Sequence, residues 1–330
     1  MPKTSTNNSA LAGKALQSRT LNGPTMGSRW SVCVETTTEL PWDELEAALQ
    51  QAVTDIDERM SRWRPESELM RLNRADTHVW HPVSQPLFTV LERGIAIGRA
   101  SDGAFDIGLG DLINAWGFGP YSSDPQAIKD SLGKVRMRAD QFIDLDRENL
   151  RVRKVLPADL DLSAIAKGYG VDRLIETLQS FGVDHALAAI DGELRALSTQ
   201  ADGRPWSVAV EAPDPDDRHI HSVLELDNAA VATSGDYRHR ANIGNSHVAH
   251  TMLRERSGPM PYRSVSVSVV AATAMDADAW ATALLVMDQH TAVKQAEILG
   301  LNALFLNGEP PRTIIRSVGP LFKQHETGGH

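Results

Sequence analysis

Cysteine is nearly absent from this chain. One cysteine among 330 residues, Cys33, excludes an internal disulfide and any zinc or iron–sulfur site that needs several thiolates. Cys33 shares one face of an alternating run with Ser31, opposite an apolar face made by Trp30, Val32 and Val34. This pattern favours a structural position on a β-strand over a role as nucleophile.

Long apolar runs are also missing. No run of about 18 apolar residues occurs, which excludes a membrane-spanning helix. Residues 1–20 are polar and contain neither the apolar core of a signal peptide nor a cysteine that could carry a lipid. We therefore expect a disordered tail over residues 1–20, a functional domain over residues 21–330 and a cytoplasmic location.

The chain carries an excess of acid without long runs of lysine or arginine. Its formal net charge of −10 disfavours a non-specific nucleic-acid binder, because phosphate backbones would be repelled. A metal ion that bridges a protein carboxylate and a ligand phosphate suits this charge balance better. With 42% hydrophobic and 23% charged residues, the chain can bury one large domain or two packed lobes.

Hydrophobic periodicity indicates interspersed helices and strands. The order lacks the regular strand–helix alternation of a doubly wound sheet, so we predict an α+β fold with mixed or antiparallel sheets and packed helices. Helices are expected over residues 41–60, 86–100, 274–288 and 291–299, with another that starts near 167 and ends before 182. Strands are expected over residues 28–35, 142–145, 186–190, 206–211, 222–226, 265–270 and 303–306.

The segment Asp161-Leu-Ser-Ala-Ile-Ala-Lys-Gly-Tyr-Gly-Val-Asp172 is the most informative part of the sequence. It places Lys167 and the backbone amides around Gly168 at the start of a predicted helix. A helix N-terminus carries a partial positive charge and suits a phosphate group. An ordinary helix start without a ligand would have a similar composition.

A second candidate site lies on the predicted helix over residues 274–288. Asp278 and Thr282 are four residues apart, so their oxygens share one face. Two hard oxygen donors suit Mg²⁺, which commonly completes its octahedron with a carbonyl, water and substrate phosphate. Alternatively, Asp276 or Asp278 caps the helix and the Thr282 hydroxyl bonds to a helix carbonyl.

Two further segments carry polar groups. The small residues Thr233-Ser-Gly-Asp-Tyr-Arg238 are typical of a tight turn, either beside a ligand or simply at the surface. His247 and His250 offer bases that titrate near neutral pH, although loop histidines are often structural. A serine-hydrolase motif is absent, and Gly108-Leu-Gly110 lacks the third glycine of a Rossmann fingerprint.

Taken together, these segments resemble the ApbE family of FAD:protein FMN transferases in order and spacing over about residues 22–310. The motifs that carry the resemblance are Thr25-Met-Gly27, Met60-Ser-Arg-Trp-Arg-Pro-Glu-Ser-Glu-Leu69 with Leu72-Asn73, Asp102-Gly-Ala-Phe-Asp106, Trp116-Gly-Phe-Gly119, Asp161 to Asp172, Thr233 to Arg238, and Ala277-Asp-Ala-Trp-Ala-Thr282.

The resemblance implies a T-fold-like architecture of two closely packed lobes. It also implies an enzyme that binds FAD with Mg²⁺, cleaves the diphosphate and attaches FMN through a phosphoester to a threonine or serine of a target flavoprotein, releasing AMP. The family's metal positions match Ala164, through its carbonyl, Asp278 and Thr282. Its FAD-lining positions match Met26, Trp63, Ala104, Phe105, Asp106, Asp161, Lys167 and Met252. Trp63 could stack on a flavin or adenine ring, or simply pack at a helix end.

The chain departs from the family pattern around the expected catalytic histidine. Spacing places that residue at His250, the expected general base, but with Ala249 before it and Leu253-Arg254 where the family has Asp-Pro. His247, which follows a serine, is the rival. Asp191-Gly192 also stands where many relatives have Gly-Gly. Exported members of the family carry a lipidation signal, and its absence from this sequence implies either a cytosolic target or a missing leader.

Two other functions remain open on the sequence alone. The same pocket with water as acceptor would make a Mg²⁺-dependent FAD diphosphatase that yields FMN and AMP. A flavin-binding protein without turnover would keep the pocket but lose the base or the metal geometry, and the altered loop after His250 favours this alternative.

Overall fold

The structure, a computed structural model, describes residues 15–132, 136–214, 219–236, 240–243, 246–308 and 313–322. Its centre is an eight-stranded sheet in the order β1-β2-β6-β7-β10-β14-β15-β16, in which every neighbouring pair is antiparallel. These strands are β1 (Gln17–Thr25), β2 (Ser28–Thr36), β6 (His185–Ile190), β7 (Glu193–Leu197), β10 (Ala230–Gly235), β14 (Val265–Ala271), β15 (Asn302–Asn307) and β16 (Ile314–Val318). The predicted α+β class is confirmed, with antiparallel sheets.

Three smaller antiparallel sheets complete the strands. They comprise β3 (His81–Pro82), β4 (Ile143–Asp146) and β5 (Arg151–Lys154); β8 (Trp206–Glu211) and β9 (Ile220–Leu226); and β11 (Arg240–Ile243), β12 (Ser246–Leu253) and β13 (Gly258–Pro261). The helices are α1 (Trp42–Met60), α2 (Glu68–Arg74), α3 (Gln85–Ala100), α4 (Gly110–Ala115), α5 (Pro125–Ser131), α6 (Ala139–Phe142), α7 (Ala166–Ser180), α8 (Ala274–Val286) and α9 (Gln289–Leu299), with a 3₁₀ turn, η1, at Arg254–Arg256.

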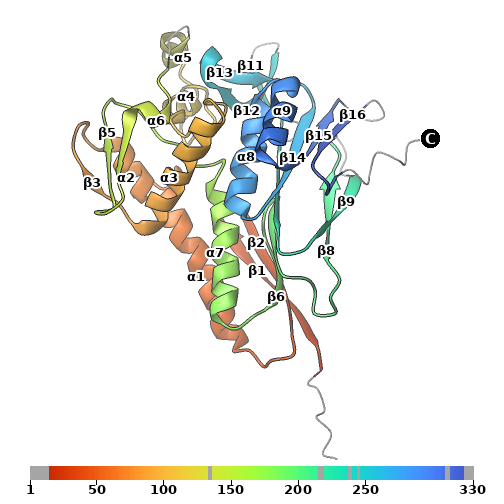
Figure 1. Ribbon diagram of the computed structural model, residues 1–330. Helices are drawn as coiled ribbons and strands as arrows, with labels where there is room; N and C mark the ends of the chain where they lie inside the picture. Colours follow the sequence, from red (N-terminus) through yellow and green to blue (C-terminus); the bar gives the residue numbers. More distant parts are fainter. Residues whose placement is uncertain are drawn as a thin grey trace, which may run out of the picture.

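Helices α1 and α7 run side by side against one face of the large sheet (Figure 1). Leu49 of α1 and Leu174 of α7 are fully buried with Val32 and Ala188, which come from adjacent strands of the sheet. The apolar stripe that predicted each helix is therefore the surface that holds it on the sheet. On the opposite face, the β8–β9 hairpin covers Val231 and Leu304.

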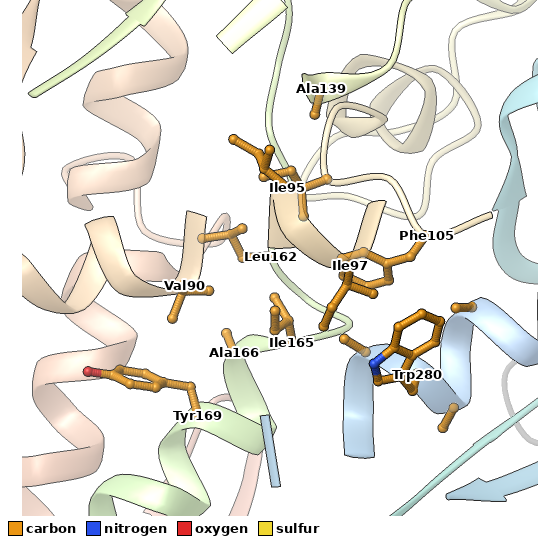
Figure 2. Packing of buried hydrophobic residues seen from close by; sticks show 14 of the residues in the cluster. Val90, Ile95, Ile97, Phe105, Ala139, Leu162, Ile165, Ala166, Tyr169 and Trp280 are labelled. Carbon is orange, nitrogen blue, oxygen red and sulfur yellow. The ribbon is translucent and has the colours of Figure 1, made fainter. Parts of the chain in front are cut away.

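A second core joins α3 and α8 to the start of α7. Figure 2 shows Phe105 beside Trp280 of α8 and Ile97 of α3, with Ile165 and Ala166 in the same cluster. Since all five side chains are buried, the residues that begin α7 are fixed by apolar packing on both sides. This packing positions the polar groups described below.

The structure confirms the predicted helices to within two residues and corrects two local predictions. The predicted disordered tail is too long, because β1 begins at Gln17 and pairs with Thr36 of β2. Backbone pairing with a neighbour holds this polar, exposed end, and composition does not reveal such pairing. Residues 1–14 lie outside the described residues. In the predicted turn from Thr233 to Arg238, the first three residues continue strand β10 to Gly235.

Among the described residues, no helix combines the length and apolar character needed to cross a bilayer.

Candidate functional site

The N-termini of α7 and α8 meet in direct contact. A Cβ atom on Gly168 would lie 2.2 Å from the carbonyl oxygen of Ala274, so the close approach requires glycine here. Gly168 donates its backbone N–H to Oδ2 of Asp278 at 3.1 Å. One of the amides predicted to be free for phosphate is therefore used by Asp278.

Asp172 makes the complementary contact from α7 to α8. Its Oδ1 and Oδ2 each accept a backbone N–H, from Ala274 and Met275, at 2.9 Å. Arg195 donates to the same Oδ1 at 2.6 Å. The last residue of the informative segment is thus a cap for α8, and two carboxylates use the partial positive charge of two helix N-termini.

Lys167 lies within a group of carboxylates. Its Nζ donates to Oε1 of Glu193 at 2.8 Å and lies 3.5 Å from Oδ2 of Asp191. Burial opposes the charge of Lys167, but the carboxylates of Glu193 and Asp278 outweigh it and raise the lysine pKa. Burial also opposes the charge of Glu193, and for this acid it raises the pKa. The Oε2 atom of Glu193 has no hydrogen-bond partner among the described residues.

Asp278 is a second buried acid of this group whose pKa is raised. Burial, followed by the nearby charge of Glu193, raises the pKa of Asp278 to about 8. The Gly168 amide is neutral, so it cannot cancel the charge of the ionised form. A divalent cation would do so, and the donor set of a carboxylate, a hydroxyl and a carbonyl fits a hard cation such as Mg²⁺.

The Thr282 hydroxyl lies one helical turn beyond Asp278. It is 2.9 Å from the Ser234 hydroxyl of β10, so it is held by a side chain rather than by a carbonyl of its own helix. Thr273 caps α8 through its side chain, and Asp276 pairs with Arg93. The alternative interpretation, in which Asp276 or Asp278 caps its own helix, is therefore wrong.

No group of three or more His, Cys, Asp or Glu side chains that could hold a metal occurs in the described ranges. A Mg²⁺ site can use few protein side chains and take the rest of its ligands from carbonyl, water and substrate. Ala164 is half-buried two residues before α7, and the family resemblance predicts that its carbonyl is a metal ligand. Its ligand role remains a prediction.

Asp161 is locked in place ahead of α7. Its Oδ2 accepts from Arg62 at 2.6 Å, and its Oδ1 accepts the Ser163 N–H at 2.8 Å. Arg62 also donates to the Gly110 carbonyl and to Asn114, and its side chain is 4% exposed. Since both charges are buried together, this pair fixes the loop that leads into α7.

The loop that contains Ala104, Phe105 and Asp106 lies next to Asp161, whose N–H donates to the Ile107 carbonyl at 2.8 Å. Ala104 lines a cleft of about 530 Å³. The Phe105 ring is 3% exposed and packs in the core near Trp280 (Figure 2), and its FAD-lining role remains a prediction.

Asp106 is a buried acid at the edge of this loop. Its Oδ1 accepts the N–H groups of Gly108 and Ala139, whereas its Oδ2 has no hydrogen-bond partner among the described residues. Burial raises the pKa of Asp106, and the nearest cation is Arg254, whose Nε lies 4.0 Å from Oδ2. Arg254, a departure from the family pattern, therefore faces a predicted FAD-lining residue.

Strand β12 carries the predicted base. His250 is exposed, whereas Ala249 and Met252 are buried, and the pairing of β12 with β13 shifts register between Val248 and Met252. A register shift of this kind turns neighbouring side chains to new faces, and such bulges are common beside active sites. The side chain of the rival, His247, lies outside the described residues.

Two further predicted residues, Met26 and Trp63, come from the β1–β2 turn and from the segment after α1. Met26 sits in the β1–β2 turn at a φ of 46°, and its Cε would be 3.3 Å from a Cβ added to Gly170 in the first turns of α7. Trp63 is 69% exposed, so its indole is accessible to a ring. Met26 thus lies beside the N-terminal part of α7, and Trp63 directly follows the buried Arg62 in the chain.

Sequence reasoning missed three residues of this site. Arg62 lies inside the motif from Met60 to Leu69, and Arg254 is one of the two residues that replace the Asp-Pro of the family. Both positions could therefore have been predicted as part of the site from the sequence. Glu193, two residues after Asp191, carried none, because its contact with Lys167 depends on how β7 packs beside α7.

Comparison with known proteins shows the family to which this chain belongs. The ApbE family model matches residues 26–305, and the chain belongs to the ApbE family. It is 30% identical to the FAD:protein FMN transferase of Klebsiella pneumoniae over 88% of this chain and 84% of that protein. Identity to the Vibrio cholerae protein of the same name is 32%, over 84% of each chain. The crystal structure of the Pseudomonas stutzeri flavinyl transferase ApbE superposes with a TM-score of 0.81 at 28% identity, covering 94% of this chain and 96% of that one.

Proposed function

We propose that this protein is a Mg²⁺-dependent FAD:protein FMN transferase. The observation that carries the proposal is the junction of α7 and α8. There Lys167, the α7 N-terminus and a buried Asp278 of raised pKa adjoin the Thr282 hydroxyl. Such a site suits a diphosphate together with a cation, and the chain's relatives carry the name of this reaction.

The metal would be held by Asp278, Thr282 and the Ala164 carbonyl. When bound, Mg²⁺ would neutralise the diphosphate and polarise its phosphoryl oxygens. Asp278 supplies the charge of this site, and Ser234 orients the Thr282 hydroxyl from β10. The buried Glu193 holds Lys167 in place, so that the lysine can bind a phosphate oxygen without moving far.

The reaction transfers FMN to a protein hydroxyl. The oxygen of an acceptor threonine or serine forms a bond to the FMN phosphorus, and the bond from that phosphorus to the AMP oxygen breaks. His250, exposed on β12, accepts the hydroxyl proton. Ala104, which lines the cleft, and Asp161, held by Arg62, would bind FAD together with Phe105, Asp106 and Lys167. Met26 and the exposed Trp63 would contribute apolar contacts, and the buried Met252 would support the site from the core.

The acceptor is a flavoprotein that presents a Ser/Thr-Gly-Ala-Thr-like segment. The test is to incubate the protein with FAD and Mg²⁺, with and without such an acceptor, and to follow AMP release and acceptor mass. A gain of one FMN in acceptor mass supports the transferase. AMP without a change in acceptor mass indicates the diphosphatase instead, and bound FAD without AMP indicates a binding protein.

A further inference from the structure

Lys167 contacts two carboxylates, of which one is buried and the other is exposed to solvent. The Glu193 side chain is 5% exposed and binds the Lys167 Nζ at 2.8 Å. The Asp191 side chain is 47% exposed and lies 3.5 Å from the same nitrogen. An ammonium group has three N–H donors, so the exposed Asp191 and a ligand phosphate can compete for the donors of Lys167 that Glu193 does not use.

The position of Asp191 is set by the backbone. It is the first residue of the two-residue turn between β6 and β7, and its φ of 55° is in the left-handed region. Glycine and asparagine adopt this conformation readily, and an aspartate tolerates it. A Cβ atom on the following Gly192 would meet nothing within 4 Å, so the turn is open on that side. Substitutions that remove the charge of Asp191 therefore leave the hairpin intact.

We infer that Asp191 sets the affinity of the site for its anionic ligand, by competing with the ligand phosphate for Lys167. The inference rests on the proposed function, because it takes the ligand of Lys167 to be the FAD diphosphate. Glu193 is too buried to exchange, whereas Asp191 can give up Lys167 to a phosphate oxygen. The Asp191 carboxylate then repels the bound diphosphate and weakens its binding.

The size of the effect follows from one exposed charge. Two unit charges 4 Å apart interact by about 1 kcal/mol in water, which corresponds to roughly a fivefold change in affinity. The interaction is screened by salt, because the Debye length falls from about 10 Å at 0.1 M to about 3 Å at 1 M. Removing the charge of Asp191 should thus tighten FAD binding about fivefold in dilute buffer, and by less in concentrated salt.

The experiment measures FAD affinity by titration of flavin fluorescence with Mg²⁺ present, for the full-length protein and the variants Asp191→Asn and Asp191→Gly, at low and high salt. Asp184→Asn is the matched control. This exposed acid precedes β6 beyond the far end of α7, about 20 Å of helix away from Lys167. The control should bind FAD as the unchanged protein does.

Tighter binding by both Asp191 variants, with a smaller gain at high salt, supports the inference. Equal or weaker FAD binding by both variants overturns it and leaves the proposed function in place, provided that the unchanged protein binds FAD. A failure of the unchanged protein to bind FAD overturns the proposed function, and this inference with it.

Discussion

Asp172 and Asp278 each cap the helix to which the other belongs. Asp172, in the second turn of α7, accepts the N–H groups of the first two residues of α8 at 2.9 Å. Asp278, in the second turn of α8, accepts the Gly168 N–H in the first turn of α7 at 3.1 Å. The exchange fixes the two helices against one another, so that the residues proposed to bind the metal and the phosphates keep their spacing.

Asp172→Ala should destabilise the protein and lower its activity together. The change leaves two buried N–H groups without an acceptor and Arg195 without its carboxylate, which together should lower the free energy of unfolding by about 3 kcal/mol. Chemical denaturation and FAD-dependent AMP release would measure both effects. The control is Asp276→Ala, in the first turn of α8, the turn that Asp172 caps. The ion pair of Asp276 with the partly exposed Arg93 should contribute less than about 1 kcal/mol to stability. Equal losses in the two variants would contradict the capping role.

Asp278→Asn should abolish turnover yet stabilise the metal-free protein as pH rises. The folded-state pKa of Asp278, about 8, lies above the ordinary 3.8. A raised carboxyl pKa gives stability that is complete below pH 3.8 and is lost progressively up to about pH 8. Asparagine stays neutral, so the variant escapes that loss.

Thermal unfolding in a chelator at pH 5.5, 7 and 8.5 would show this difference. The melting temperature of Asp278→Asn should exceed that of the unchanged protein by a margin that widens with pH, and added Mg²⁺ should narrow it by stabilising only the unchanged protein. Buried acids away from Asp278 are common to both proteins and cancel in the comparison. The repulsion between Glu193 and an ionised Asp278 exists only in the unchanged protein, and it widens the margin in the same direction. A margin that does not vary with pH would show that the Asp278 carboxyl is not perturbed by burial.

Arg62→Ala should weaken both the fold and FAD binding. Removing the arginine leaves Asp161 buried without its 2.6 Å partner, a loss expected to lower the free energy of unfolding by about 3–5 kcal/mol. Arg62→Lys keeps the charge but loses the planar set of donors that reach Gly110 and Asn114. Its free energy of unfolding should lie between those of the unchanged protein and Arg62→Ala. Arg64→Ala, at an exposed pair with Asp57, should be nearly neutral. Denaturation curves that do not separate the Arg62 and Arg64 variants would refute the role of the buried pair.

Thr282→Val should raise the Mg²⁺ requirement, whereas Thr282→Ser should not. Valine has the same shape but offers no oxygen to a cation or to Ser234. Loss of a ligand or of the group that orients it should raise the Mg²⁺ concentration for half-maximal activity by about 10–100-fold. Serine keeps the hydroxyl and serves as the control. A Mg²⁺ dependence unchanged by valine would remove Thr282 from the metal site.

Local sequence patterns predicted those parts of the site that lie within one helix. The spacing of Asp278 and Thr282 placed them one turn apart, and the apolar stripe that includes Leu174 predicted α7 with Lys167 at its start. Both arguments use only the period of a helix, which is a property of neighbouring residues.

The contacts that tune the site join residues far apart in the chain. Gly168 and Asp278 are 110 residues apart, Arg62 and Asp161 are 99 apart, and Lys167 and Glu193 are 26 apart. No local period encodes these pairings, because they depend on which strands neighbour each other and on how α7 and α8 cross. The same reason explains the strand end at Gln17, which is held by pairing with β2.

The most direct test of the account is the affinity for FAD with and without Mg²⁺, in the unchanged protein and in Asp278→Asn. If Asp278 holds a cation that bridges to the FAD diphosphate, Mg²⁺ should tighten FAD binding at least tenfold in the unchanged protein and leave the variant unaffected. FAD binding that responds equally to Mg²⁺ in both proteins would contradict a metal site at the junction of α7 and α8.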